Sequence, residues 1–195
     1  MGLVARQKEP MPFKFNQCKA IQAVAFLLKQ KHATRTDNYM RLLKLLYIAD
    51  RESLQETGRP ITGDRFIAME RGPTLSHLLD LVKQRAYDSS EWDKYIELNG
   101  YEITLVQDPG NDKLCRYDVD KLKKVWHEFQ DFDEWEVAEA THGFLEWQKN
   151  KPKATERNDI DLFDVLEALG RQDWYKDILE DARDEASFVQ RFGMG

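Results

Sequence analysis

The apolar run from Leu42 to Ala49 constrains the fold of this chain more than any other feature. Thr36 or Asp37 can act as N-cap of the helix expected around it, and Gly58 suits the C-terminal stop. Apart from Lys44, the run is apolar on nearly every side of that helix. A helix that is apolar all round is a buried one. The sequence therefore predicts a central helix that the rest of the domain surrounds.

Apolar residues recur at helical spacing through most of the remaining chain. They predict helices over residues 17–31, 75–85, 119–131, 133–140, 160–169 and 174–188. Asn16 and Thr74 are suitable N-caps for the first two of these. Glycines and prolines punctuate residues 58–73, so only residues 65–69 are expected to form a short strand there.

The periodicity changes to two around Asn99-Gly100, a dipeptide typical of tight hairpins. A two-residue loop at this dipeptide predicts the pairs Leu98–Tyr101, Ile96–Ile103, Tyr95–Thr104 and Glu97–Glu102. The first two pairs form an apolar face, and the glutamate pair is expected in solvent because like charges repel across strands. The elements together predict a mainly α (α+β) fold: a compact helical domain around a buried helix, one small antiparallel β-hairpin, and C-terminal helices.

The chain has 195 residues, of which 42% are hydrophobic and 33% charged, as in ordinary globular domains. No apolar stretch approaches the ~20 residues of a membrane-spanning helix, and the N-terminus lacks a signal-peptide core. These features predict a cytoplasmic protein without a membrane segment. We expect a flexible leader over residues 1–13, the main domain over 14–150, and an acidic helical extension over 151–195 packed on that domain.

Charge is distributed unevenly along the chain. The net charge is −6, and residues 131–195 hold 8 Lys and Arg against 17 Asp and Glu. An acidic C-terminal third repels nucleic acid and attracts a basic partner. The simpler interpretation of most of these carboxylates is a solvated helical surface.

The usual catalytic motifs are missing from the sequence. It contains no phosphate-binding glycine loop, no nucleophile elbow and no His-Glu-x-x-His, and its two cysteines lie far apart. We therefore predict no catalysis, no metal and no cofactor. A hydrolase using His142 with Asp50 or Asp64 stays an alternative, although nothing in the sequence places these residues together.

Asp50 lies on the face of the central helix that tips towards the core. A carboxylate there needs a partner, and Arg65, Arg71 and backbone N–H groups of the next loop are candidates. The simpler interpretation is that Asp50 ties down this loop and that Asp64 shapes a turn. The alternative is that both belong to a ligand or partner site.

Aromatic side chains crowd the span from residue 129 to 147. They are Phe129, Phe132, Trp135, Phe144 and Trp147. Helical aromatics are usually core, but aromatics are also common anchors of protein interfaces. We favour the core for this set, whereas Trp174 and Tyr175 suit either role equally.

Four short motifs carry a resemblance to a known family. They are KLLYIADR at 44–51, GRPITGD at 58–64, AMERGPTLS at 68–76 and THGFLEW at 141–147. In this order and spacing they resemble the Panacea domain, a family that includes SocA-like antitoxins and phage-associated GepA-like proteins. The acidic extension after residue 150 fits the family less clearly.

The resemblance implies a mainly helical, non-enzymatic antitoxin. Such a protein neutralises a cognate toxin, often encoded by the adjacent gene and sometimes in a prophage, by direct protein contact. In one branch it also delivers the toxin to an AAA+ protease. The predicted partner-binding or family-motif residues are Lys44, Tyr47, Asp50, Thr62, Asp64, Arg65, Met69, His142 and Trp147. The residues Gly58, Gly63, Gly72 and Pro73 are expected to shape the backbone.

A DNA-binding regulator is the alternative function. The predicted order of helices, short strand and hairpin is similar to a winged helix-turn-helix. In that arrangement the third helix, with His77, Lys83 and Arg85, reads DNA, and the hairpin is the wing. The few basic residues of this helix and the acidic chain argue against it.

Overall fold

Helices form most of the computed structural model, which describes residues 11–153 and 156–192. The helices are α1 (Gln17–Gln30), α2 (Tyr39–Thr57), α3 (Ser76–Val82), α4 (Ser90–Asp93), α5 (Arg116–Phe129), α6 (Glu134–His142), α7 (Leu145–Asn150), α8 (Leu162–Ala168), the 3-10 turn η1 (Gln172–Trp174) and α9 (Tyr175–Phe192). The strands are β1 (Thr36–Asn38), β2 (Phe66–Met69), β3 (Gly72–Leu75), β4 (Ile96–Asn99), β5 (Glu102–Leu105) and β6 (Asn158–Asp159). The predicted mainly α fold with a small antiparallel hairpin is confirmed.

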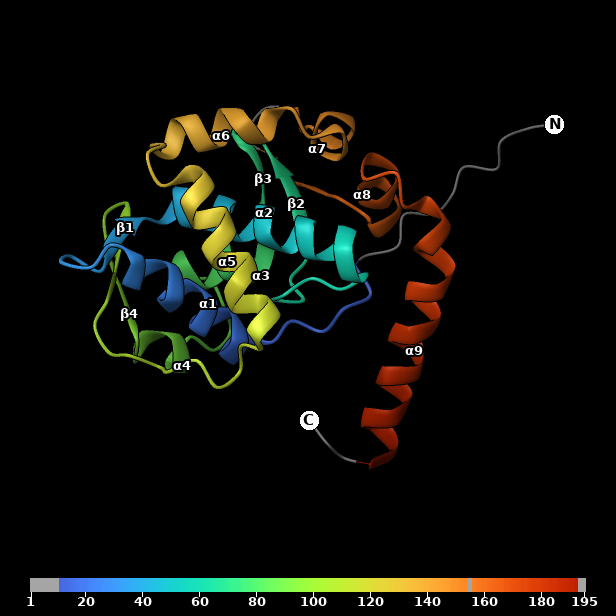
Figure 1. The fold of residues 1–195 in the computed structure, drawn as a ribbon, viewed down its shortest axis with the longest axis horizontal. Helices are drawn as coiled ribbons and strands as arrows, with labels where there is room; N and C mark the ends of the chain where they lie inside the picture. Colours follow the sequence, from blue (N-terminus) through green and yellow to red (C-terminus); the bar gives the residue numbers. More distant parts are fainter. Residues whose placement is uncertain (1–10, 154–155, 193–195) are drawn as a thin grey trace.

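The central position of α2 is confirmed as well. Every residue from 41 to 50 is buried, and α1, α5, α6 and β3 all contact this helix. Figure 1 shows α2 in the middle of the domain, with α6 on one side and α1 on the other. The N-cap is Asn38, the last residue of β1, whose side chain accepts a hydrogen bond from the backbone N–H of Met40; the predicted caps Thr36 and Asp37 lie two residues and one residue earlier in that strand. Gly58 ends the helix in the left-handed conformation, as predicted.

The hairpin forms, but in a different register from the one predicted. Its pairs are Ile96–Leu105, Glu97–Thr104, Leu98–Ile103 and Asn99–Glu102. The two-residue loop is therefore Gly100-Tyr101, in which Gly100 supplies a positive φ. This register buries Ile103 and Leu105 and leaves Tyr101 exposed. The strand β5 also pairs with β1, so the hairpin is part of a three-stranded sheet.

The strand predicted over residues 65–69 forms as β2, which is the central strand of a second three-stranded sheet with the order β3-β2-β6. Thr74 does not cap a helix: it lies in β3, opposite Ile67. The helix α3 starts later than predicted and ends at Val82, three residues early. Pro73 is compatible with β3 because this strand lies at the edge of the sheet, where a missing N–H is tolerated.

The C-terminal helices follow the prediction in order but differ in extent. The helix α7 and the strand β6 occupy part of residues 149–159, which the sequence marks as a connection. In Figure 1, α9 lies along one side of the domain and continues past it. None of the described helices is long and apolar enough to cross a membrane. Of the predicted leader, residues 1–10 lie outside the described residues, whereas Met11 is buried.

Candidate functional site

Asp50 holds the loop that follows α2. One carboxylate oxygen accepts hydrogen bonds from the backbone N–H groups of Ile61 (2.9 Å) and Thr62 (3.0 Å), and the other accepts from the Thr62 hydroxyl. Burial raises the pKa of Asp50 to about 7, while these hydrogen bonds act in the opposite direction. The donors are the loop and not Arg65 or Arg71, so the predicted loop-anchoring role is confirmed.

Asp64 joins the same loop to α3. Its carboxylate accepts from the backbone N–H groups of His77 and Leu78, each at 2.9 Å, and lies 2.7 Å from Nδ1 of His77. The hydrogen bond that the His77 ring makes to the Asp64 carboxylate raises the pKa of His77. The backbone N–H of Asp64 in turn donates to Thr62 Oγ1 at 3.1 Å. Asp64 therefore does the capping that the sequence assigns to Thr74.

Tyr47 belongs to a buried cluster that connects α2 with α7. Its hydroxyl donates to Glu146 Oε1 at 3.0 Å, and Arg51 Nε donates to the same oxygen at 2.6 Å. The Arg51 guanidinium also lies 4.2 Å from the centre of the Phe144 ring. Glu146 and Arg51 were not among the predicted site residues. The available signal was the four-residue spacing of Tyr47 and Arg51, which places both on one face of α2.

Trp147, in α7, connects this helix to β2 of the second sheet. Its indole N–H donates to the backbone carbonyl of Met69 at 2.9 Å. The His142 ring stacks on Trp147 with 4.4 Å between ring centres, and its Nδ1 lies 3.0 Å from Glu139. The other ring nitrogen of His142 is buried, with no hydrogen-bond partner among the described residues.

Lys44 is a buried cation on α2. Only 3% of the residue is exposed, and its ammonium donates to the carbonyl of Pro73 at 3.1 Å. No carboxylate of the described residues lies within ion-pair distance, and burial lowers the pKa of Lys44 to about 7. A Cβ atom on Gly72 would lie 2.7 Å from this ammonium and 2.6 Å from Thr141 Oγ1. These contacts and the positive φ of 98° together favour glycine at position 72.

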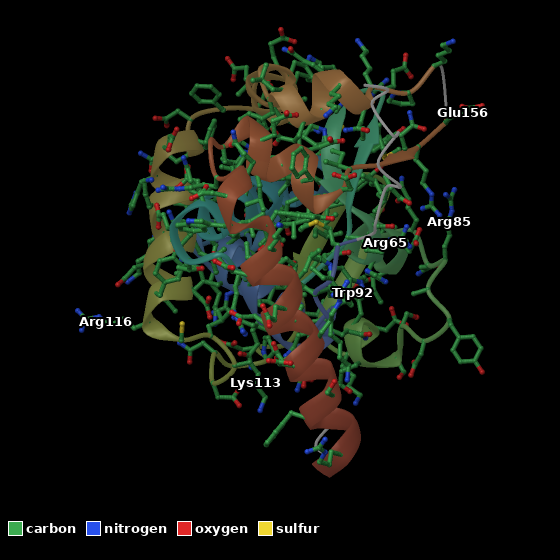
Figure 2. The ribbon with its side chains drawn as sticks, turned by 90° about the vertical axis from the view of Figure 1, so that its right-hand side faces the viewer. Arg65, Arg85, Trp92, Lys113, Arg116 and Glu156 are labelled. Carbon is green, nitrogen blue, oxygen red and sulfur yellow. The ribbon has the colours of Figure 1, made fainter. Side chains whose placement is uncertain are left out.

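Lys44 also lines a partly enclosed cavity of about 340 Å³ between α2, the β2–β3 turn and α3, which we call the Lys44 cavity. Its charged lining residues are Lys44, Arg71, Lys83, Arg85, Glu70 and Glu156. Its apolar lining includes Met40, Leu43 and Leu79. Arg85 and Glu156 lie on the same side of the molecule in Figure 2. Four basic side chains face two carboxylates, so the cavity favours an anion.

The structure does not bring His142 together with either aspartate of the hydrolase alternative. His142 contacts Glu139 and Trp147, whereas Asp50 and Asp64 bond to the loop after α2 and to α3. Among the residues that the structure describes, no group of three His, Cys, Asp or Glu could hold a metal ion.

The remaining predicted residue, Arg65, is near the surface and pairs with Asp159 of β6 at 2.8 Å. The aromatic set divides between core and surface: Phe129 and Trp147 are buried, while Trp135 is 52% and Phe132 41% exposed. Arg71 lies 4.6 Å from the Trp135 ring centre. The predicted core position is therefore confirmed for Phe129 and Trp147 and is wrong for Phe132 and Trp135.

These observations define a mainly helical domain whose polar motif residues bond to one another across its elements. The model of the family described as "Antitoxin SocA-like, Panacea domain" matches residues 42–148. Because this match covers more than half of the chain, the protein belongs to that family. Neither the curated proteins nor the solved structures gave a significant match.

Proposed function

We propose that this protein is an antitoxin that neutralises a cognate toxin by direct protein–protein binding, with no catalysis of its own. Membership of the SocA-like antitoxin family over residues 42–148 carries this proposal. The toxin is expected to be the product of the adjacent gene. Delivery of the bound toxin to an AAA+ protease is a finer possibility, and it requires the same binding step first.

The toxin contact is proposed for the exposed surface of α6 and α7 and the turn before them. Three apolar side chains of this surface, Phe132, Trp135 and Leu145, are 41%, 52% and 61% exposed. Aromatic side chains and arginine are the residue types that most often dominate binding energy, and Arg71 lies over Trp135. Most motif residues, such as Tyr47 and the Asp50 carboxylate, are buried and serve the fold.

The acidic helix α9 is proposed to steer a basic toxin. Its exposed carboxylates are Asp177, Glu180, Asp181, Asp184 and Glu185. Charge of one sign on one surface raises association rates with a partner of opposite charge. We therefore expect the rate of complex formation to fall with rising salt concentration.

The geometry argues against the winged-helix alternative. The helix α3 has seven residues, and Lys83, which follows it, bonds to the Tyr39 hydroxyl and lies over its ring. The hairpin that would serve as a wing pairs with β1 in a sheet. The exposed hairpin residues Glu97 and Glu102 are acidic and would repel the phosphates of DNA.

Co-expression with the neighbouring gene product tests the antitoxin proposal. We expect the neighbour to arrest growth alone, to be harmless with this protein, and to co-purify with it. Trp135→Ala should weaken the complex at least about tenfold, which is typical of an interface anchor. Tyr87→Ala is the matched control, because Tyr87 is a fully exposed aromatic in the loop after α3. A neighbour that is harmless, or that does not bind, contradicts the proposal.

A second measurement addresses the finer mechanism. The half-life of the toxin in cells should fall when this protein is present if it acts as a proteolytic adaptor. An unchanged half-life together with rescued growth supports neutralisation by binding alone.

A further inference from the structure

We propose that the Lys44 cavity binds a small organic anion. Its oxyanion, a carboxylate or a phosphate, pairs with the Lys44 ammonium, and its apolar body lies against Met40, Leu43 and Leu79. This site is separate from the α6–α7 surface assigned to the toxin, and the proposal does not depend on the toxin contact.

In the described part of the chain, the Lys44 ammonium has fewer hydrogen-bond acceptors than it can use. An ammonium group has three donors, and the described residues provide one acceptor, the Pro73 carbonyl at 3.1 Å. Buried charges are normally paired, because removing an ion from water without compensation is costly. The lowered pKa of Lys44, about 7, reflects this unfavourable burial. An anion bound beside Lys44 removes that cost.

The side chains around the Lys44 cavity carry more positive than negative charge. Besides Lys44, the cations Arg71, Lys83 and Arg85 line it, against the carboxylates Glu70 and Glu156. These three cations outnumber the two carboxylates by one, and protonated Lys44 adds a second excess positive charge. Lys83 is held in place by its hydrogen bond to the Tyr39 hydroxyl, so its ammonium keeps a defined position in the cavity wall.

The size and lining of the Lys44 cavity suit a small molecule. A volume of about 340 Å³ lies near the lower end of the ~300–1,000 Å³ typical of small-molecule sites. Apolar walls with a few placed polar groups are also typical of such sites. The cavity is too small for a folded element of another protein. A small anion with a compact apolar body therefore suits it better than a protein segment.

Three probes with the same phenyl body test the site: phenylacetate, phenyl phosphate and the neutral phenylacetamide. Binding is measured by isothermal titration calorimetry on the full chain near neutral pH, and stabilisation by thermal melting. We expect phenylacetate or phenyl phosphate to bind and to raise the melting temperature, and phenylacetamide to do neither. The stronger of the two anions distinguishes a carboxylate site from a phosphate site.

Substitutions then locate the binding. Lys44→Met should weaken anion binding at least tenfold, whereas Lys123→Met, which removes an exposed lysine of α5, should leave it unchanged. If Lys44→Met does not fold, the double variant Arg71→Gln/Arg85→Gln changes two exposed side chains at the same cavity. That variant should weaken binding severalfold.

Three results would overturn the proposal. They are no binding of either anion at about 10 mM, the weak end of specific affinity; equal binding of phenylacetamide; and full affinity in both cavity variants. If neither anion binds and Lys44→Met instead weakens toxin capture, the cavity receives an acidic side chain of the toxin. The antitoxin proposal then stands, while the small-anion proposal fails.

Discussion

Charged side chains have different surroundings in the family-matched segment and on α9. Within residues 42–148, Glu146 is fully buried and bonds to Tyr47 and Arg51 of another helix. On α9, Glu185 also pairs with an arginine, Arg59, but the two side chains are 62% and 55% exposed. The same pair of residue types therefore supports the fold in one region and remains in solvent in the other.

The difference separates residues that build the domain from residues that a partner can reach. The family motifs hold α2, the following loop, the β2–β3 hairpin and α7 together from the inside. The acidic face of α9 lies outside the matched segment and makes few such bonds. Substitutions in the two regions should consequently affect different properties: stability in the first, and association with a partner in the second.

The largest effect is expected for Glu146→Ala. It leaves the partly buried guanidinium of Arg51 and the buried hydroxyl of Tyr47 without their acceptor. Breaking a buried ion pair by removing one partner costs about 3–5 kcal/mol. Chemical denaturation should show this loss in the free energy of unfolding. Glu146→Gln keeps an acceptor and should cost less, so equal losses in both variants would contradict the role assigned to Glu146.

A pH-dependent effect is expected for Lys44→Met. Folded Lys44 loses its proton near pH 7, and the unfolded side chain loses it near 10.5. Between these values the unfolded state binds more protons, so wild-type stability rises with pH relative to the variant. The relative gain from pH 6 to pH 10 should be on the order of 4 kcal/mol.

Comparison with the variant isolates Lys44, because both proteins share the other charged groups that face it. These groups are Arg71, Lys83, Arg85, Glu70 and Glu156, with His142 and Tyr39 nearby. Urea unfolding of both proteins across this pH range provides the measurement. Parallel pH profiles would show that Lys44 titrates normally and would remove the electrostatic support for the anion site.

A smaller effect is expected for Asp64→Ala. The variant loses the two hydrogen bonds to the N-terminus of α3 and should be less stable by about 2 kcal/mol. Asp64 also raises the pKa of His77, so this part of the stability is present below pH 6.5 and disappears as pH rises through the folded pKa. The loss should therefore be larger at pH 5.5 than at pH 8. His77→Gln should abolish that pH dependence, and a pH-independent loss in Asp64→Ala would contradict it.

Local patterns predict the elements of this fold that depend on local interactions. The helix Gln17–Gln30 with its cap, the stop at Gly58 and the loop-anchoring role of Asp50 all follow from neighbouring residues. The strand β1 was missed because its three residues acquire their structure by pairing with β5, about 65 residues away. The same applies to β6, which is two residues long and pairs with β2.

The hairpin register shows a second limit. Asn99-Gly100 indicates where the turn lies, but the two-residue loop starts one residue later than predicted, at Gly100. The observed turn shifts the pairing by two residues, so each face keeps its side chains, Leu105 pairs with Ile96, and Tyr101 moves into the loop; the dipeptide alone does not encode this choice. The Glu146 cluster was missed for a related reason, since its members are almost a hundred residues apart. The unpaired state of Lys44 likewise depends on what the fold places around it.

The smallest effect on stability is expected for Glu185→Gln. Exposed ion pairs contribute about 0–1 kcal/mol, and the Arg59–Glu185 pair is more than half exposed on both sides. Denaturation should place the variant within about 0.5 kcal/mol of the wild type. If the proposed steering of a basic toxin holds, association should nevertheless slow, and more so at low salt, where exposed charges are least screened. Stopped-flow mixing with the toxin at two salt concentrations measures this rate. An unchanged rate would place the toxin contact away from α9, and a stability loss as large as that of Glu146→Ala would remove the distinction between the two regions.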